Sequence, residues 1–232
     1  MADLSAFPIT RRWPATNPDA IQLYSFPTPN GVKVSTMLEE TGLTYEAHKT
    51  FSNEDLDSAE FLSLNPNHKI PAIIDPNGPD GQPLALFESG AILIYLAEKT
   101  GQFYGQTAAE RATINQWLMW QMGGMGPMFG QMGFFTLYGG KDVADPLPRN
   151  RYLNESARLL RVLDGALAGK EWIAGDYSIA DMAIAPWVNA LDYYGTKPQI
   201  GWDDLQNVPA YVERFMARPA VHVAKNVPDR NA

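Results

Sequence analysis

Residues 28–31 (Thr-Pro-Asn-Gly) combine a hydroxyl and an amide at a point where an alternating apolar segment gives way to helical spacing. A helix N-terminus carries unpaired N–H groups and about half a positive charge. A hydroxyl and an amide donor beside it could hydrogen-bond to a thiolate and favour it over the thiol. The same residues also fit a Thr N-cap followed by an Asn-Gly turn that binds nothing, and spacing alone favours this structural interpretation.

A second motif places Ile70 and Pro71 directly before the apolar run 72–75. If the X-Pro bond were cis, the N–H and C=O of Ile70 would be free to pair with a peptide ligand as an added strand. Only about 5–6% of X-Pro bonds in folded proteins are cis. An ordinary trans proline at the start of a strand is therefore the simpler expectation.

A third motif, Glu88 followed by Ser89, lies between an apolar run and a helical pattern. Glu88 could bind an ammonium group, and the Ser89 hydroxyl and N–H could bind a carboxylate. Taken alone, the pair is better explained as another helix cap. Together, however, the three motifs suit one kind of ligand, which carries a thiol, a peptide-like backbone, an ammonium and carboxylates. Glutathione has all of these groups.

The elements that must position these motifs alternate between strand and helix in the first hundred residues. Residues 21–26 and 45–49 alternate as strands, and 72–75 and 84–87 flank a Pro-, Asn- and Gly-rich turn as a hairpin. Helices are expected from Pro29 to Gly42, with Thr28 as N-cap, over 54–64, and from Ser89 to Gly101. The order is β-α-β followed by α-β-β-α.

Strand patterns stop after residue 105, and the rest of the chain has helical spacing. Helices are expected over 108–122 or beyond, 151–167, 179–191 and 210–218. Ser178 and Asp181 match a capping box at the start of the third of these, which is a folding signal. The sequence therefore predicts an extended N-terminal arm (1–20), a mixed α/β domain (21–101) and an all-helical domain (108–225).

Composition restricts the class of protein. The chain has 232 residues, of which 45% are hydrophobic and 19% charged, as in ordinary globular proteins. It has no apolar run long enough to span a membrane and no secretory signal in its opening residues, so a cytoplasmic protein is expected. The formal net charge of −8 argues against binding to nucleic acid or to an anionic membrane surface.

The chain contains no cysteine. This excludes structural disulfides, thiolate zinc sites and a cysteine nucleophile. The three histidines lack the spacing of a metal site, so no metal is expected. Any thiol chemistry must use a thiol that a ligand brings in.

Residues 21–100 resemble the thioredoxin-like domain of a cytosolic glutathione S-transferase, and residues 108–220 resemble its helical domain. Six segments carry the resemblance in the right order: 28–31, 67–73 (Asn-His-Lys-Ile-Pro-Ala-Ile), 87–92, 123–128, 172–175 and 178–181. The chain is most similar to the bacterial Nu-type branch, whose members are glutathione-dependent disulfide reductases. The resemblance implies an N-terminal thioredoxin-like (βαβαββα) domain followed by a C-terminal helical bundle.

The resemblance also implies roles for particular residues. Thr28 and Asn30 would act near the sulfur of glutathione as the catalytic residues. Arg151 would reach glutathione across a homodimer. The residues implied to bind glutathione are Asn30, Lys69, Ile70, cis Pro71, Glu88, Ser89 and Arg151.

The implied activity is reduction of a small disulfide by the glutathione thiolate, with reduced or oxidised glutathione as the bound cosubstrate. Two alternatives stay open. The thiolate could instead attack carbon in an apolar electrophile, as in a conjugating transferase, or the chain could bind glutathione without turnover, since fold alone does not confer activity. Tyr24 on the first strand is interpreted as a packing residue.

Overall fold

The computed structural model describes residues 2–230, which form two compact units. One unit comprises residues 2–102 together with 219–230, and the other comprises Phe103–Arg218. The sequence placed residues up to 225 with the helical domain, whereas α10 (Pro219–Ala224) packs against α1 (Pro29–Thr41) of the first unit. The Ser35 hydroxyl donates to the carbonyl oxygen of Ala224 at 2.9 Å, which fixes this contact.

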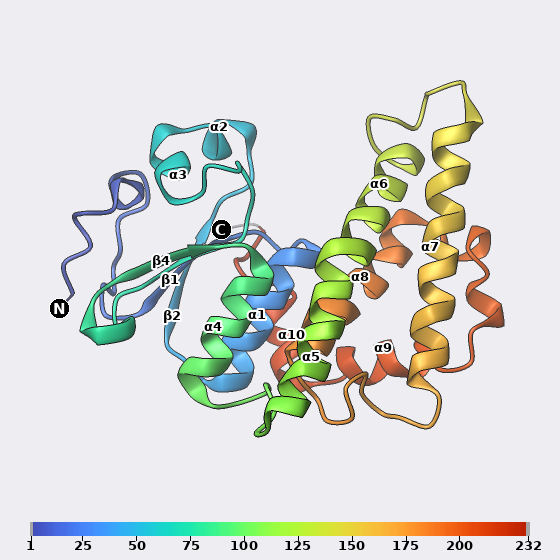
Figure 1. Cartoon of the computed structure of the whole chain (residues 1–232). Coiled ribbons are helices and arrows are strands. Elements are labelled where there is room, and N and C mark those ends of the chain that lie inside the picture. Colours follow the sequence, from blue (N-terminus) through green and yellow to red (C-terminus); the bar gives the residue numbers. More distant parts are fainter. Residues whose placement is uncertain (1, 231–232) are drawn as a thin grey trace. The chain divides into compact units, whose positions relative to one another are not determined.

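A four-stranded sheet forms the centre of the first unit (Figure 1). Its order is β2-β1-β3-β4, with β1 parallel to β2 and antiparallel to β3, and with β3 antiparallel to β4. The strands are β1 (Ile21–Ser25), β2 (Tyr45–Lys49), β3 (Ala72–Asp75) and β4 (Leu84–Phe87). This mixed sheet and its helices confirm the predicted thioredoxin-like topology.

Helices α1 and α4 (Ser89–Thr100) pack side by side on one face of the sheet (Figure 1). Both helices end at a glycine in the left-handed conformation, Gly42 after α1 and Gly101 after α4, as their sequences predict. Three residues separate the end of β1 from the start of α1, and one residue separates the end of β4 from the start of α4. The fold therefore presents two helix N-termini close to the strand ends.

The opposite face of the sheet is covered by the N-terminal arm and by α3 (Ala59–Leu64). The arm contains a short helix, η1 (Pro8–Arg11), and buries Leu4 and Ile9 against Tyr24 and Phe61. It is tied to β2 because Glu46 accepts the N–H groups of Thr16 and Asn17. The arm is thus partly helical and buried rather than simply extended, since its apolar side chains complete the core on this face.

The single helix expected over 54–64 is two short helices, α2 (Asn53–Leu56) and α3. Each begins at its own serine N-cap, because Ser52 accepts the N–H of Asp55 and Ser58 accepts the N–H of Phe61. The extended backbone of Ser58 interrupts the helix between them. A further 3-10 turn, η2 (Pro79–Gly81), lies between β3 and β4.

The second unit is all-helical, as predicted. Its Asp181 carboxylate is fully buried and closes the expected capping box with Ser178, and it also accepts the N–H of Ile173 at 3.0 Å. Burial raises the pKa of Asp181 to about 6. The elements are α5 (Ala108–Trp120), the π-helical turn η3 (Gln121–Met125), α6 (Gly126–Thr136), α7 (Pro146–Leu167), α8 (Ile179–Tyr194), η4 (Lys197–Gln199), η5 (Trp202–Asp204) and α9 (Val208–Met216).

No helix within residues 2–230 is both long and apolar enough to cross a membrane. Nor do these residues group three or more His, Cys, Asp or Glu side chains in a way that could hold a metal ion.

Candidate functional site

Thr28 begins helix α1. Its hydroxyl oxygen accepts the N–H of Gly31 at 3.2 Å, and Pro29 occupies the first helical position. Accepting this bond leaves the O–H of Thr28 able to donate, because a hydroxyl carries one donor and two acceptor positions. The helix-cap role and the sulfur-binding role are therefore compatible.

Gly31 lets the first turn of α1 lie against the end of β1. A Cβ atom at this position would collide with the carbonyl oxygen of Phe26 and would lie 2.7 Å from the Ser25 hydroxyl. Because backbone atoms cannot yield, glycine is required here. The glycine of the Thr-Pro-Asn-Gly motif thus allows the N-terminus of α1 to pack closely against the end of β1.

The Ile70–Pro71 peptide bond is cis, which is the rarer of the two forms considered from the sequence. Strand β3 begins immediately after it, with Ala72 opposite Phe87 on β4. Within the described residues, no hydrogen bond engages the backbone N–H or C=O of Ile70. Ile70 therefore presents the unpaired backbone groups that an added peptide strand needs.

Glu88 occupies the N-cap position of α4 in an unusual backbone conformation. Its φ of 72° and ψ of 110° lie outside the regions that L-residues normally adopt, and its side chain makes no capping hydrogen bond. Backbone strain of this kind costs on the order of 1–3 kcal/mol. Ser89, which is 3% exposed, is the first residue of the helix. The ordinary side-chain cap considered from the sequence is therefore not what forms here.

One cavity of about 240 Å³ joins the motifs. It brings together six of the residues singled out in the sequence, and the two further lining residues are asparagines to which the sequence assigned no role. The lining residues are Asn30, Asn65, Asn67, Lys69, Ile70, Pro71, Glu88 and Ser89. Thr28 does not line the cavity, although it caps the helix on which Asn30 lies.

Asn65 and Asn67 support the loop before β3. Asn65 donates its side-chain amide to the carbonyl oxygen of Lys69 and accepts the N–H of Asn67 at 2.9 Å. The sequence signal was the Asn-Pro-Asn cluster at 65–67, a pattern typical of turns. Its role in the cavity depends on the packing of the loop and could not be seen from spacing.

Arg151 lies in the other unit, exposed on helix α7. Its implied role at the glutathione site stays a prediction. Tyr24, by contrast, is fully buried on the arm side of the sheet, where its ring stacks on His48 at 4.7 Å between centroids. Burial raises the pKa of Tyr24 well above its usual value, so the residue behaves as a packing group.

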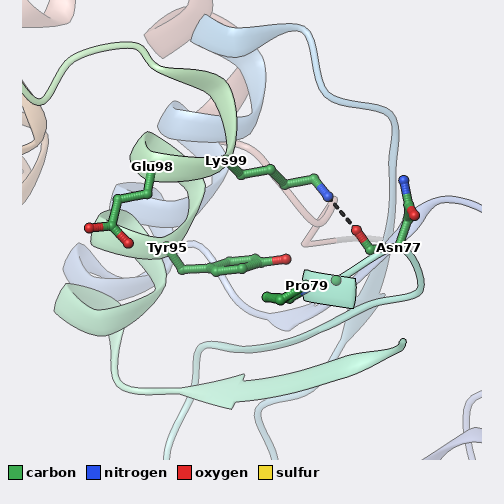
Figure 2. A pocket seen from close by; sticks show the side chains of 6 residues that line it. Asn77, Pro79, Tyr95, Glu98 and Lys99 are labelled. Atoms are coloured by element: carbon green, nitrogen blue, oxygen red, sulfur yellow. Dashed lines mark hydrogen bonds between the residues drawn. The ribbon is translucent and has the colours of Figure 1, made fainter. Parts of the chain in front are cut away.

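A second cavity, of about 280 Å³, lies at the C-terminal end of α4 (Figure 2). Its lining residues are Asn77, Gly78, Pro79, Tyr95, Glu98 and Lys99. Figure 2 shows the Lys99 side chain reaching over the Tyr95 ring to the Asn77 carbonyl oxygen, to which it donates at 2.6 Å. Lys99 also pairs with the buried carboxylate of Asp75 at 2.8 Å, and the Tyr95 hydroxyl donates to the same carboxylate at 2.6 Å.

Two family models match parts of the chain. Residues 19–98 match the family model "Glutathione S-transferase, N-terminal domain", and residues 134–219 match "Glutathione S-transferase, C-terminal domain". The chain belongs to the glutathione S-transferase family. The motifs that carried the resemblance in the first unit fall within the first of these matches.

Two relatives of this transferase are named as disulfide-bond oxidoreductases. The chain is 46% identical over 210 residues to the Escherichia coli disulfide-bond oxidoreductase YfcG, covering 86% of this chain and 92% of that protein. It is 39% identical over 212 residues to the E. coli disulfide-bond oxidoreductase YghU, covering 87% and 72% respectively.

Solved structures of two bacterial glutathione transferases superpose closely on this chain. A glutathione transferase from Pseudomonas putida superposes with a TM-score of 0.96 at 59% identity, covering 97% of this chain and 99% of that one, and it holds one glutathione disulfide per subunit. A Burkholderia graminis transferase superposes with a TM-score of 0.97 at 59% identity, covering 99% and 97%, and it holds two glutathione molecules per subunit.

Proposed function

We propose that this transferase is a glutathione-dependent disulfide reductase that binds glutathione in the 240 Å³ cavity and offers its thiolate to a disulfide. One observation carries the proposal: a single cavity unites the start of α1, the unpaired backbone of Ile70 and the strained corner at Glu88. The names of the E. coli relatives and the glutathione disulfide in the P. putida structure support the same activity.

The cavity offers partners for the cysteinyl backbone and for the γ-glutamyl end of glutathione. The unpaired N–H and C=O of Ile70 suit the backbone of the cysteinyl residue. Ser89 and the N–H groups that begin α4 suit the α-carboxylate of the γ-glutamyl residue, because a helix N-terminus stabilises an anion. Glu88 suits the neighbouring ammonium group, and Lys69 adds a positive charge at the rim of the cavity.

Asn30 and Thr28 would stabilise the sulfur as a thiolate. A free thiol has a pKa of about 8.5 and is mostly protonated at neutral pH. Lowering that pKa by one unit takes about 1.4 kcal/mol, which is the size of one or two hydrogen bonds to a charged acceptor together with the α1 dipole. The side chains at residues 28 and 30 lie at the start of this helix, where both effects act together.

The chemistry then needs no cysteine of the protein, consistent with a chain that has none. The bound thiolate attacks one sulfur of the substrate disulfide, the S–S bond breaks, and one substrate thiolate leaves and takes up a proton. A second glutathione thiolate attacks the glutathione sulfur of the mixed disulfide. The products are glutathione disulfide and the second substrate thiol, so two glutathiones supply the two electrons.

Two assays with glutathione distinguish the alternatives. A small hydroxyalkyl disulfide tests reduction, and a chloronitrobenzene tests conjugation to carbon. We expect the disulfide to react much faster. A far higher rate with the chloronitrobenzene would make the protein a conjugating transferase, and retention on immobilised glutathione without either activity would make it a glutathione-binding protein.

Assembly and location belong to the same proposal. We infer a cytoplasmic homodimer in which Arg151 of one subunit serves the glutathione site of the other. Mixing the variants Arg151→Ala and Asn30→Ala, each of which is expected to have reduced activity, tests this: if Arg151 acts across the dimer, the heterodimer contains one intact site and activity rises above that of either variant alone. If activity does not rise after verified subunit exchange, Arg151 does not act across the dimer. Sedimentation measures the dimer, and cell fractionation tests the location.

A further inference from the structure

Helix α1 carries a buried lysine, Lys33. Lys33 is 0% exposed, although its side chain ends in an ammonium group that is strongly hydrated in water. Burial of such a group is unfavourable unless polar atoms surround it. Its presence beside a candidate binding cavity therefore calls for an account of what it contacts.

The contact that matters is with the start of α4. The Lys33 ammonium lies 3.4 Å from the hydroxyl oxygen of Ser89, a residue that lines the 240 Å³ cavity. Lys33 itself is buried and is not among the residues that line this cavity. The two residues are 56 positions apart in the sequence and are brought together by the packing of α1 on α4.

This contact orients the Ser89 hydroxyl. A lysine ammonium can only donate hydrogen bonds, whereas a serine hydroxyl can donate one and accept two. Because the Ser89 oxygen accepts from Lys33, the hydrogen of its O–H is directed away from the ammonium. Lys33 also places a positive charge 3.4 Å from a hydroxyl oxygen whose residue lines the cavity.

Near neutral pH, Lys33 is close to the midpoint between its charged and neutral forms. Burial lowers the pKa of Lys33 to about 7, and the nearby Glu88 carboxylate opposes this shift. The elements that pack against α1 carry other charged or titratable side chains, namely Tyr95, Glu98 and Lys99 on α4 and His222 on α10. A second negative charge near Ser89 would favour the charged lysine and raise its pKa.

We propose that Lys33 is a positioning residue, which orients the Ser89 hydroxyl and supplies a buried positive charge for a ligand carboxylate bound against Ser89. The inference rests on the proposed glutathione site and assigns it a residue that does not contact the ligand. It predicts that binding is accompanied by uptake of a proton near neutral pH, as Lys33 becomes fully charged.

Calorimetry with S-methylglutathione tests whether ligand binding is accompanied by proton uptake at Lys33. The blocked sulfur cannot release a proton, so the thiol does not contribute to the measurement. Titrations at pH 7.5 in buffers of different ionisation enthalpy give the number of protons taken up. We expect net uptake by the wild-type protein, and we expect Lys33→Met to bind about tenfold more weakly and to take up none.

Lys33→Arg separates positioning from simple packing. Arginine keeps its charge at all accessible pH values, so this variant should recover much of the affinity lost in Lys33→Met while showing no proton uptake. Lys225→Met, which removes a lysine just after α10, is the matched control and should behave as wild type. Circular dichroism checks folding, and if Lys33→Met does not fold, the wild-type and Lys33→Arg titrations still decide the question.

The outcomes distinguish this inference from the function on which it rests. If the wild-type protein binds S-methylglutathione without taking up a proton and Lys33→Met binds equally well, the role of Lys33 is wrong and the glutathione site stands. If neither glutathione nor S-methylglutathione binds the wild-type protein, the proposed function itself fails, and the role of Lys33 fails with it.

Discussion

The two ends of helix α4 each border a cavity, and the two cavities are similar in volume. The one at the N-terminal end measures about 240 Å³ and the one at the C-terminal end about 280 Å³. Each includes a lysine and a glutamate among its lining residues. Volume and residue type therefore do not distinguish them.

The hydrogen bonds do distinguish them. At the C-terminal end, Lys99, the Tyr95 hydroxyl and the Asn77 N–H all bind the Asp75 carboxylate. Lys99 also donates to the Asn77 carbonyl oxygen (Figure 2), and a lysine in the last turn suits the helix dipole. At the N-terminal end, Ile70 has unpaired backbone groups and Glu88 is held in a strained conformation. A ligand site is therefore marked by polar groups that the fold leaves unsatisfied, and not by the size of the cavity.

The largest effect is expected at the C-terminal end. Asp75→Ala should lower the free energy of unfolding by about 3 kcal/mol, because it leaves Lys99 and the Tyr95 hydroxyl without their buried partner. Glutathione affinity should change less than twofold. Urea unfolding and calorimetry measure the two quantities, and an unchanged unfolding midpoint would show that this cluster does not hold the helix end.

The next effect distinguishes the two lysines. The native state holds Lys33 with a pKa of about 7 against 10.5 in the unfolded chain, so between these values the unfolded chain binds more protons and stability rises with pH. Lys33→Met removes the buried charge. It should be about 2 kcal/mol more stable than wild type at pH 6, with the gain shrinking as the pH rises from 7 to 10.5.

Lys99→Met is the matched comparison and should lose stability at both pH values, since Lys99 pairs with a buried carboxylate. Urea unfolding at pH 6 and pH 9 measures both variants. A Lys33→Met variant that is less stable than wild type at pH 6 would mean that the buried lysine stabilises the fold and is not a residue held there at a cost.

A third effect concerns catalysis alone. Asn30→Ala should reduce the rate of disulfide reduction at least tenfold, or about 1.4 kcal/mol, because one donor to the thiolate is lost. Its stability should change little, since Asn30 lies half-buried at the edge of the cavity. Asn77→Ala, at the other cavity, is the control. Unchanged kinetics of Asn30→Ala would remove Asn30 from the mechanism.

Features of the fold that depend on neighbouring residues were predictable from the sequence. Thr28 and Pro29 mark the start of α1, and Gly42 marks its end, because helix caps are set within one turn of the chain. The capping box at Ser178 was predictable for the same reason. The cis bond before Pro71 was only one of two alternatives, since the local sequence does not decide it.

Features that depend on packing between distant segments were not predictable. The arm was expected to be extended, yet Leu4 and Ile9 complete a core that includes Phe61. Lys33 stands between two valines on a helix, and only the packing of α4 and α10 against that helix shows that it is buried. Hydrophobic spacing assigns charged residues to the exposed face, so it has no means of finding a buried lysine.

The smallest effect is expected at Glu88, where the backbone is strained. Glu88→Ala should weaken glutathione binding about fivefold, or about 1 kcal/mol, because the ligand ammonium loses its carboxylate partner. Glu98→Ala, the matched change at the other end of α4, should leave binding unchanged. Calorimetry with glutathione measures both, and an unchanged dissociation constant in Glu88→Ala would exclude the carboxylate from binding.

A glycine at the same position separates the side chain from the backbone. Glu88→Gly removes the same carboxylate, so it should bind as weakly as Glu88→Ala. Glycine, however, adopts a φ of 72° without strain, so Glu88→Gly should be more stable than Glu88→Ala by about 1 kcal/mol in urea. Equal stabilities would show that the conformation at residue 88 is not strained. In that case the contrast between the two ends of α4 would rest on the unpaired backbone of Ile70 alone.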